Sequence, residues 1–269
     1  MNTVILHIFA FSLYFLASCA FAANLYLRGG RWQNIGTAVA VLGAGFHTLG
    51  IGWWCATIHQ TPFAASSGTL SVAAWILALS FLPVRRITKI ESLGALAMPI
   101  CGLLTLLSLL RGNRSVSTIP YLRSGITSLH VMLILSSFAL LLFAGCCAAF
   151  YIWQYGQLKH PKLDNRRYQL PPLETVDRAA FGLVACAHPP LTIGLILGFV
   201  SAAHGVTDSK PLTDPHVLVS VGAWAVCSAY LIARLWAGWR GTRINWLLIA
   251  ATALSALLYF LPSSVHRFT

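Results

Sequence analysis

Histidine side chains are the residues of this sequence best suited to chemistry. A neutral imidazole can ligate iron through one ring nitrogen, and a cofactor held between helices takes one ligand from each of two segments that meet at the same depth. His130 stands near the start of a long apolar run, and His266 follows the last one. We therefore interpret His130 and His266 as candidate iron ligands at one membrane surface. The alternative for either residue is a solvated or hydrogen-bonded side chain without a cofactor.

His47 is a third candidate, because it lies in the middle of an apolar run. A polar ring in the hydrocarbon core of a bilayer is costly unless it has a partner. That partner could be a bound cofactor, which makes His47 a further cofactor-binding candidate. A hydrogen bond to a Ser or Thr on a neighbouring helix would satisfy the ring equally well. The sequence leaves both alternatives open.

The other residue types that carry chemistry are sparse. None of the seven cysteines belongs to a Cys-x-x-Cys motif, so a thiol relay or a zinc knuckle has no support. Of the six acidic residues, none lies in the middle of an apolar run, although pumps usually need a carboxylate there. Asp177 ends a basic polar segment, and we expect it to pair with nearby arginines. We expect no catalytic residue set and no independent enzymatic activity.

The composition sets the surroundings of these residues. Hydrophobic residues make up 57% of the 269, charged residues only 9%, and the mean hydropathy is +0.74. A soluble domain cannot bury that much apolar surface, so the chain is predicted to be a polytopic membrane protein. The net charge of +12 could suggest nucleic acid as a partner, but the basic residues form short clusters between apolar runs. That distribution is typical of membrane proteins, and we expect no nucleic-acid partner.

Eight apolar runs are long enough to be transmembrane helices. They cover residues 4–27, 36–57, 68–84, 92–110, 125–153, 179–202, 216–237 and 245–262. The predicted fold is an all-α membrane helix bundle that forms a single transmembrane domain over residues 1–269. The fifth run exceeds the roughly 20 residues that cross a bilayer, so it should tilt or project. Glycines in the second run, such as Gly43, Gly45, Gly50 and Gly52, are interpreted as sites of close helix packing.

The basic clusters predict the orientation of these eight spans. With eight spans, thirteen of the 18 Lys and Arg residues fall on one side of the membrane and five fall on the side of the termini. Basic loops are usually cytoplasmic. We therefore expect both termini to lie outside, in a multi-pass protein of the bacterial inner membrane.

Two stretches carry a resemblance to a known family. One comprises Trp224, Tyr230-Leu231, Arg234, the turn Gly238-Trp239-Arg240-Gly241-Thr242-Arg243, and Trp246; the other is the segment 129–139, reading LHVMLILSSFA. The chain resembles the cytochrome c assembly proteins of the CcsA and HemX type, especially the short bacterial YpjD-like inner-membrane proteins. The Gly-Trp-Arg-Gly turn is the more specific of the two matches.

This resemblance implies a cofactor and partners. Members of the family present haem at the outer face between two histidines that flank a tryptophan-rich loop, and pass it to apocytochrome thiols. The resemblance implies that His130 is the first of these histidines and His266 the second, with haem as the cofactor. It also implies apocytochrome c or other cytochrome c assembly proteins as partners, besides the lipid bilayer. The sequence departs from the pattern because the loop 203–215 has no tryptophan and Ile232 replaces a third family histidine.

Two other functions stay open. Pro99 and the pair Pro189-Pro190 lie inside apolar runs and could mark broken helices around the central site of a small-molecule transporter. The lack of intramembrane acids and of an internal repeat argues against that function. Alternatively, the chain is a non-catalytic membrane partner of a larger complex, and its histidines are structural.

Overall fold

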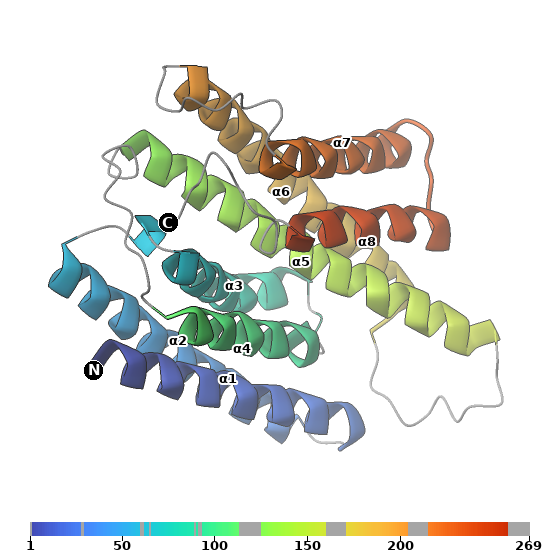
Figure 1. The fold of residues 1–269 in the computed structure, drawn as a ribbon. Coiled ribbons are helices and arrows are strands. Elements are labelled where there is room, and N and C mark those ends of the chain that lie inside the picture. Colours follow the sequence, from blue (N-terminus) through green and yellow to red (C-terminus); the bar gives the residue numbers. More distant parts are fainter. Residues whose placement is uncertain are drawn as a thin grey trace. The chain divides into compact units, whose positions relative to one another are not determined.

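The protein is built from helices (Figure 1). The computed structural model describes residues 2–27, 30–59, 62–64, 66–88, 90, 93–112, 125–159, 171–203 and 215–257. Within these ranges no strand occurs, which confirms the all-α fold class. The elements are α1 (Asn2–Tyr26), α2 (Arg31–Ile58), the 3-10 helix η1 (Pro62–Ala64), α3 (Ser66–Thr88), α4 (Leu93–Arg111), α5 (Gly125–Lys159), α6 (Leu173–Ala203), α7 (Pro215–Leu235) and α8 (Thr242–Leu257).

Seven of these helices, α1 to α7, are long and apolar enough to cross a membrane, and α8 is a shorter apolar helix. The chain is therefore a multi-pass membrane protein. Helix α5 has 35 residues and a length of about 52 Å, which exceeds the roughly 30 Å of a hydrocarbon core. Helix α6 begins directly after Pro171 and Pro172, as expected for residues that discourage a continuous helix.

The prolines inside the apolar runs do not break their helices. Pro99 lies within α4, and Pro189 and Pro190 lie within α6, both of which continue through these positions. A proline inside a transmembrane helix is tolerated when neighbouring groups satisfy the backbone. The broken helices that would favour a transporter are thus missing from these two places.

The chain divides into two compact units. The first comprises Met1–Arg114 and Gln154–Thr175, and the second comprises Ser115–Trp153 and Val176–Thr269. In the first unit α1 packs against α2 and α4, and α3 packs against α4. Whether the two units function as the single transmembrane domain expected from the sequence stays a prediction.

A regular series of rings and glycines joins α1 to α2. A β-carbon added at Gly36, Gly43 or Gly50 of α2 would lie 3.2, 3.0 or 2.9 Å from the rings of Phe21, Tyr14 or His7 of α1, respectively. Both sets are spaced by seven residues and run in opposite directions, which places one ring against each glycine. Of the four glycines expected to mediate packing, Gly43 and Gly50 do so, whereas Gly45 and Gly52 face open space.

The second unit contains α7, α8 and most of α5 and α6. Helices α5 and α8 meet closely where a β-carbon added at Gly145 would lie 2.5 Å from Thr252. The Thr252 hydroxyl also donates a hydrogen bond to the Leu141 carbonyl at 3.1 Å. Residues 236–241, the basic turn, connect α7 to α8, and these two helices pack against each other. Small residues thus bring helices together in both units.

Candidate functional site

His130 lies in the second turn of α5, where it is half-buried against α6. Its Nδ1 donates a hydrogen bond to the Gly194 carbonyl at 2.6 Å. Because a carbonyl can only accept, the neutral ring carries its proton on Nδ1 and its lone pair on Nε2. A β-carbon added at Gly198 would lie 2.7 Å from Cε1 of His130, so this glycine provides room for the ring.

This hydrogen bond is of the kind that metal-ligating histidines usually make. Ligating histidines usually donate their other ring N–H to a carbonyl or carboxylate, which fixes both the tautomer and the orientation of the ring. The Gly194 carbonyl acts in this way on His130. His266, the expected second ligand, lies outside the described residues.

His47 lies in a different place, among α1, α2 and α3 of the first unit, and its side chain is fully buried. The Tyr14 hydroxyl lies 3.2 Å from its Nδ1, and the Ser71 hydroxyl lies 2.9 Å from its Nε2. The serine hydrogen bond expected as the alternative to a cofactor is therefore present. Both ring nitrogens of His47 are occupied by side chains of neighbouring helices, and its role in cofactor binding stays a prediction.

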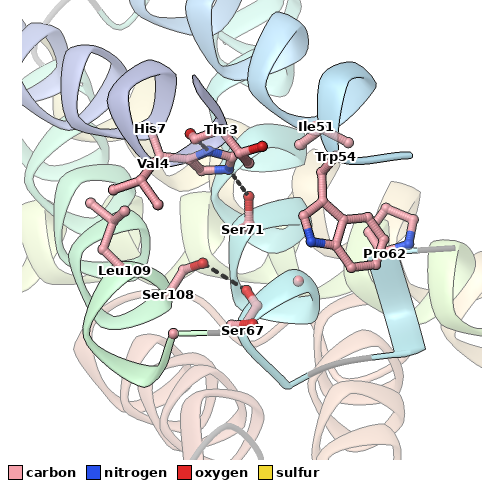
Figure 2. Close-up of a pocket in the computed structure, with 12 residues that line it drawn as sticks. Thr3, Val4, His7, Ile51, Trp54, Pro62, Ser67, Ser71, Ser108 and Leu109 are labelled. Carbon is pink, nitrogen blue, oxygen red and sulfur yellow. Dashed lines mark hydrogen bonds between the residues drawn. The ribbon is translucent and has the colours of Figure 1, made fainter. Parts of the chain in front are cut away.

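His7 joins the same cluster, as Figure 2 shows for its contact with Ser71. Its Nε2 lies 2.8 Å from the Ser71 hydroxyl, and its Nδ1 lies 2.8 Å from the Thr3 carbonyl. The two histidine rings stand edge to face, with 5.0 Å between their centroids. We refer to His7, Tyr14, His47 and Ser71 as the histidine–serine cluster.

The direction of every hydrogen bond in this cluster follows from the Thr3 carbonyl. Because that carbonyl only accepts, neutral His7 donates through Nδ1 and accepts the Ser71 hydroxyl proton at Nε2. Ser71 has no second proton, so His47 donates to it through Nε2. His47 then accepts the Tyr14 hydroxyl proton at Nδ1. All four side chains are thus satisfied without a cofactor.

A small pocket adjoins the cluster at the ends of the four helices of the first unit (Figure 2). Its walls include His7, Trp54, Ser67 and Ser71. The Ser67 hydroxyl is buried and has no hydrogen-bond partner within the described part of the chain. The pocket volume of about 80 Å³ corresponds to a few water molecules, at about 30 Å³ each. The pocket is suited to water and is too small for a porphyrin.

The participation of His7, Tyr14 and Ser71 in this cluster was not predicted from the sequence. A signal for the two ring-bearing residues does exist, because Phe21, Tyr14 and His7 repeat every seven residues and match the spacing of Gly36, Gly43 and Gly50. Recognising it requires the knowledge that α1 and α2 pack antiparallel. No comparable sequence pattern identifies Ser71.

Polar contacts also join α6 to α7 in the second unit. His188 Nε2 and the Ser228 hydroxyl lie 2.8 Å apart, and the Trp224 indole N–H donates to the Thr192 hydroxyl at 2.9 Å. The rings of His188 and Trp224 stack, with 5.8 Å between their centroids. Trp224 is therefore part of a structural contact between these helices.

The basic turn is tied to the same pair of helices. Arg234 of α7 forms a two-armed ion pair with Asp177 of α6, in which its Nη1 lies 3.2 Å from Oδ1 and its Nη2 contacts Oδ2. Nη1 also donates to the Trp239 carbonyl at 3.2 Å. Two glycines of the turn, Gly238 and Gly241, have φ angles of 63° and 91°, a conformation that side-chain-bearing residues rarely adopt. These backbone angles explain why glycine occupies both ends of the Gly-Trp-Arg-Gly sequence.

Among the described residues, no group of three or more His, Cys, Asp or Glu side chains could hold a metal ion.

A comparison with protein families relates this chain to known proteins. The model of the family described as cytochrome c assembly protein matches residues 63–268. The chain belongs to the cytochrome c assembly protein family. The resemblance noted from the basic turn and from the segment around His130 is thereby confirmed. The matched region contains His130, Arg234 and the basic turn, whereas His7 and His47 precede it.

Individual relatives agree with this membership. The inner membrane protein YpjD of Escherichia coli K12 is 27% identical over 256 residues, which cover 91% of this chain and 94% of the relative. The cytochrome c biogenesis protein CcsA of Guillardia theta is 26% identical over 232 residues, covering 77% of this chain and 76% of the relative. CcsA of Synechococcus elongatus is 35% identical over 86 residues, which are 32% of this chain and 26% of that protein. No solved structure matches the chain.

Proposed function

We propose that this cytochrome c assembly family member handles haem at the outer face of the bacterial inner membrane, with His130 and His266 as the residues that would hold the haem iron. Its family membership supports a role in cytochrome assembly. The names of its relatives, an inner membrane protein and cytochrome c biogenesis proteins, support both the location and the process. The expected partners are the lipid bilayer, apocytochrome c and other assembly proteins.

The observation that carries the proposal is the hydrogen bond from His130 to the Gly194 carbonyl. It puts the lone pair on Nε2, the form in which an imidazole binds iron, and it fixes the direction of the ring. Gly194 and Gly198 lie one helical turn apart on α6 and both contact this side chain. The Gly194 carbonyl accepts its hydrogen bond, and Gly198 leaves room for its ring. Bound haem would supply an iron atom that accepts histidine nitrogens as ligands.

The proposed topology places both ligands on one side of the membrane. Eight spans with both termini outside put the start of α5 and the C-terminal segment at the outer face, and the turn between α7 and α8 in the cytoplasm. The excess of basic residues in the loops assigned to the cytoplasm supports this orientation. The shorter α8 then serves as the eighth span.

Visible absorption spectroscopy of the purified protein tests the proposal. In detergent, the wild-type protein should show a low-spin spectrum of haem with two histidine ligands, in oxidised and reduced states. His130→Ala and His266→Ala should each lose this low-spin signal. His188→Gln is the matched control, because His188 lies in the same unit but bonds to Ser228. It should keep the wild-type spectrum.

Each other outcome has a defined meaning. A low-spin spectrum that persists in both alanine variants would overturn the ligand assignment, and His47→Ala would then test the remaining cofactor-binding prediction. A wild-type protein that takes up no haem even from an excess would overturn haem handling itself. The role of a non-catalytic partner in a larger assembly would then be favoured.

A further inference from the structure

The turn between α7 and α8 bears an exposed surface of aromatic and basic side chains. It consists of Trp236, Trp239, Arg240, Arg243 and Trp246, which we call the Trp–Arg surface. The three tryptophans are 87%, 54% and 58% exposed, in sequence order. Both arginines are also exposed. Such a concentration of exposed indole is unfavourable in water and marks an interaction surface.

The backbone that carries this surface is held in place. The Trp239 N–H donates to the Ala233 carbonyl at 3.0 Å, and Arg234 donates to the Trp239 carbonyl at 3.2 Å. At the start of α8, the Asn245 side-chain amide donates to the Gly241 carbonyl at 2.9 Å. The tryptophans and arginines therefore project from a fixed turn and from the start of α8, so little ordering is needed when a partner binds.

The charge of the surface is positive and uncompensated in the described part of the chain. The carboxylate of Asp177 is engaged by Arg234, and the first turn of α8 contains no acidic residue. No described carboxylate forms an ion pair with Arg240 or Arg243. These two guanidinium groups are thus available to an anion, and guanidinium groups bind phosphate with particular strength.

We propose that the Trp–Arg surface binds the phosphate headgroups of anionic phospholipids. Indole rings favour the boundary between headgroups and acyl chains, where the apolar ring and the polar N–H are both accommodated. Arginines at that boundary meet the negative potential of an anionic leaflet. The Trp–Arg surface combines both features on a turn that joins two apolar helices, which keeps it at the membrane surface.

Native mass spectrometry of the full-length protein in mild detergent tests this proposal. Phosphatidylglycerol is titrated into the wild type and into the variant Arg240→Gln/Arg243→Gln, with phosphatidylcholine as the neutral lipid. Each arginine near an anionic surface contributes roughly a fivefold factor, so the variant should bind phosphatidylglycerol about tenfold or more weakly. Phosphatidylcholine binding should not change.

Two further variants separate this surface from general charge. Arg31→Gln/Arg86→Gln removes two exposed arginines of the first unit and should bind phosphatidylglycerol within about twofold of the wild type. Arg240→Lys/Arg243→Lys keeps the charge and should retain most of the binding. Equal losses in the two glutamine variants, or no loss in Arg240→Gln/Arg243→Gln, would overturn the proposal.

Competition with inorganic phosphate distinguishes a lipid headgroup from a free anion. Phosphatidylglycerol should remain bound in the presence of excess phosphate, because the tryptophans contact the lipid and not the ion. Full displacement by phosphate would assign the arginines to a free anion and overturn the lipid proposal. None of these measurements involves haem, so their outcome is independent of the His130 and His266 assignment.

Discussion

The first and second units each hold a buried or half-buried histidine between helices, but they treat it differently. His47 has both ring nitrogens bonded to side chains, Tyr14 and Ser71, and is fully buried. His130 has its Nδ1 bonded to a backbone carbonyl and is half-buried at a helix end. The difference lies in the partner, because a hydroxyl can donate or accept whereas a carbonyl fixes the tautomer.

This comparison separates two uses of histidine in a membrane. In the histidine–serine cluster, each side chain satisfies the next, and the cluster joins three helices without leaving a ring nitrogen of His47 for a ligand. At His130, a backbone carbonyl orients the ring through its Nδ1. We therefore expect substitutions at the first site to act mainly on stability and substitutions at the second to act mainly on haem.

The largest effect is expected for His47→Ala. The substitution leaves a cavity among α1, α2 and α3 and removes the His47 partner of the Tyr14 hydroxyl and one of the two histidine partners of the Ser71 hydroxyl. The loss of buried volume and of two hydrogen bonds should lower the free energy of unfolding by about 2–3 kcal/mol. His130→Ala, at a half-buried position where the ring bonds to the Gly194 carbonyl, should lower it by about 1 kcal/mol or less. Unfolding of both variants in detergent, followed by circular dichroism, measures the difference. Equal destabilisation by the two substitutions would remove the distinction between the two sites.

Sequence patterns predicted more of the fold than of the sites. Hydropathy is a local property, and it was sufficient for the all-α class and for the long apolar helices. The C-terminal stretch with the basic turn and the segment 129–139 were together sufficient for the family, and the glycines of the turn meet a local backbone requirement. The ion pair of Asp177 could not be predicted from its neighbours in the sequence. This residue was expected to pair with arginines near it in sequence, yet it pairs with Arg234, 57 residues away. Contacts of that kind depend on how helices pack, which hydropathy does not specify.

The histidine–serine cluster illustrates the same limit. A serine or threonine partner for His47 could be anticipated from the cost of an unpaired ring in a membrane. The identity of that partner, Ser71, and the addition of His7 depend on the contacts of α1 and α3 with α2. For His130, a position near a helix end could be predicted from the sequence. Its contacts with Gly194 and Gly198 could not, because they depend on how α5 packs against α6.

An intermediate effect on stability is expected when a methyl group is added at either of two glycines that contact a histidine ring, Gly50 and Gly198. Gly50→Ala would place a β-carbon 2.9 Å from the His7 ring, and Gly198→Ala would place one 2.7 Å from Cε1 of His130. Each ring must move, at a cost of about 1–2 kcal/mol. If the comparison holds, Gly50→Ala lowers stability without affecting haem uptake, whereas Gly198→Ala also reduces the low-spin haem signal. Gly45→Ala is the control, because a β-carbon there meets no neighbour, and it should match the wild type in both measurements. A haem signal unchanged in Gly198→Ala would argue against the orientation of His130 as the basis of ligation.

The smallest effect on stability is expected for Tyr14→Phe, which removes the hydroxyl that bonds to His47 in the histidine–serine cluster. The Tyr14 to His47 distance of 3.2 Å is the longest hydrogen bond of the cluster, and hydrogen bonds between membrane helices average about 0.6 kcal/mol. The free energy of unfolding should therefore fall by about 0.5–1 kcal/mol. In a double-mutant cycle with His47→Ala, the effect of Tyr14→Phe should largely vanish, because the hydroxyl then has no His47 partner to lose. Additive effects would mean that Tyr14 contributes through its ring packing against Gly43 and not through the hydrogen bond that orders the cluster.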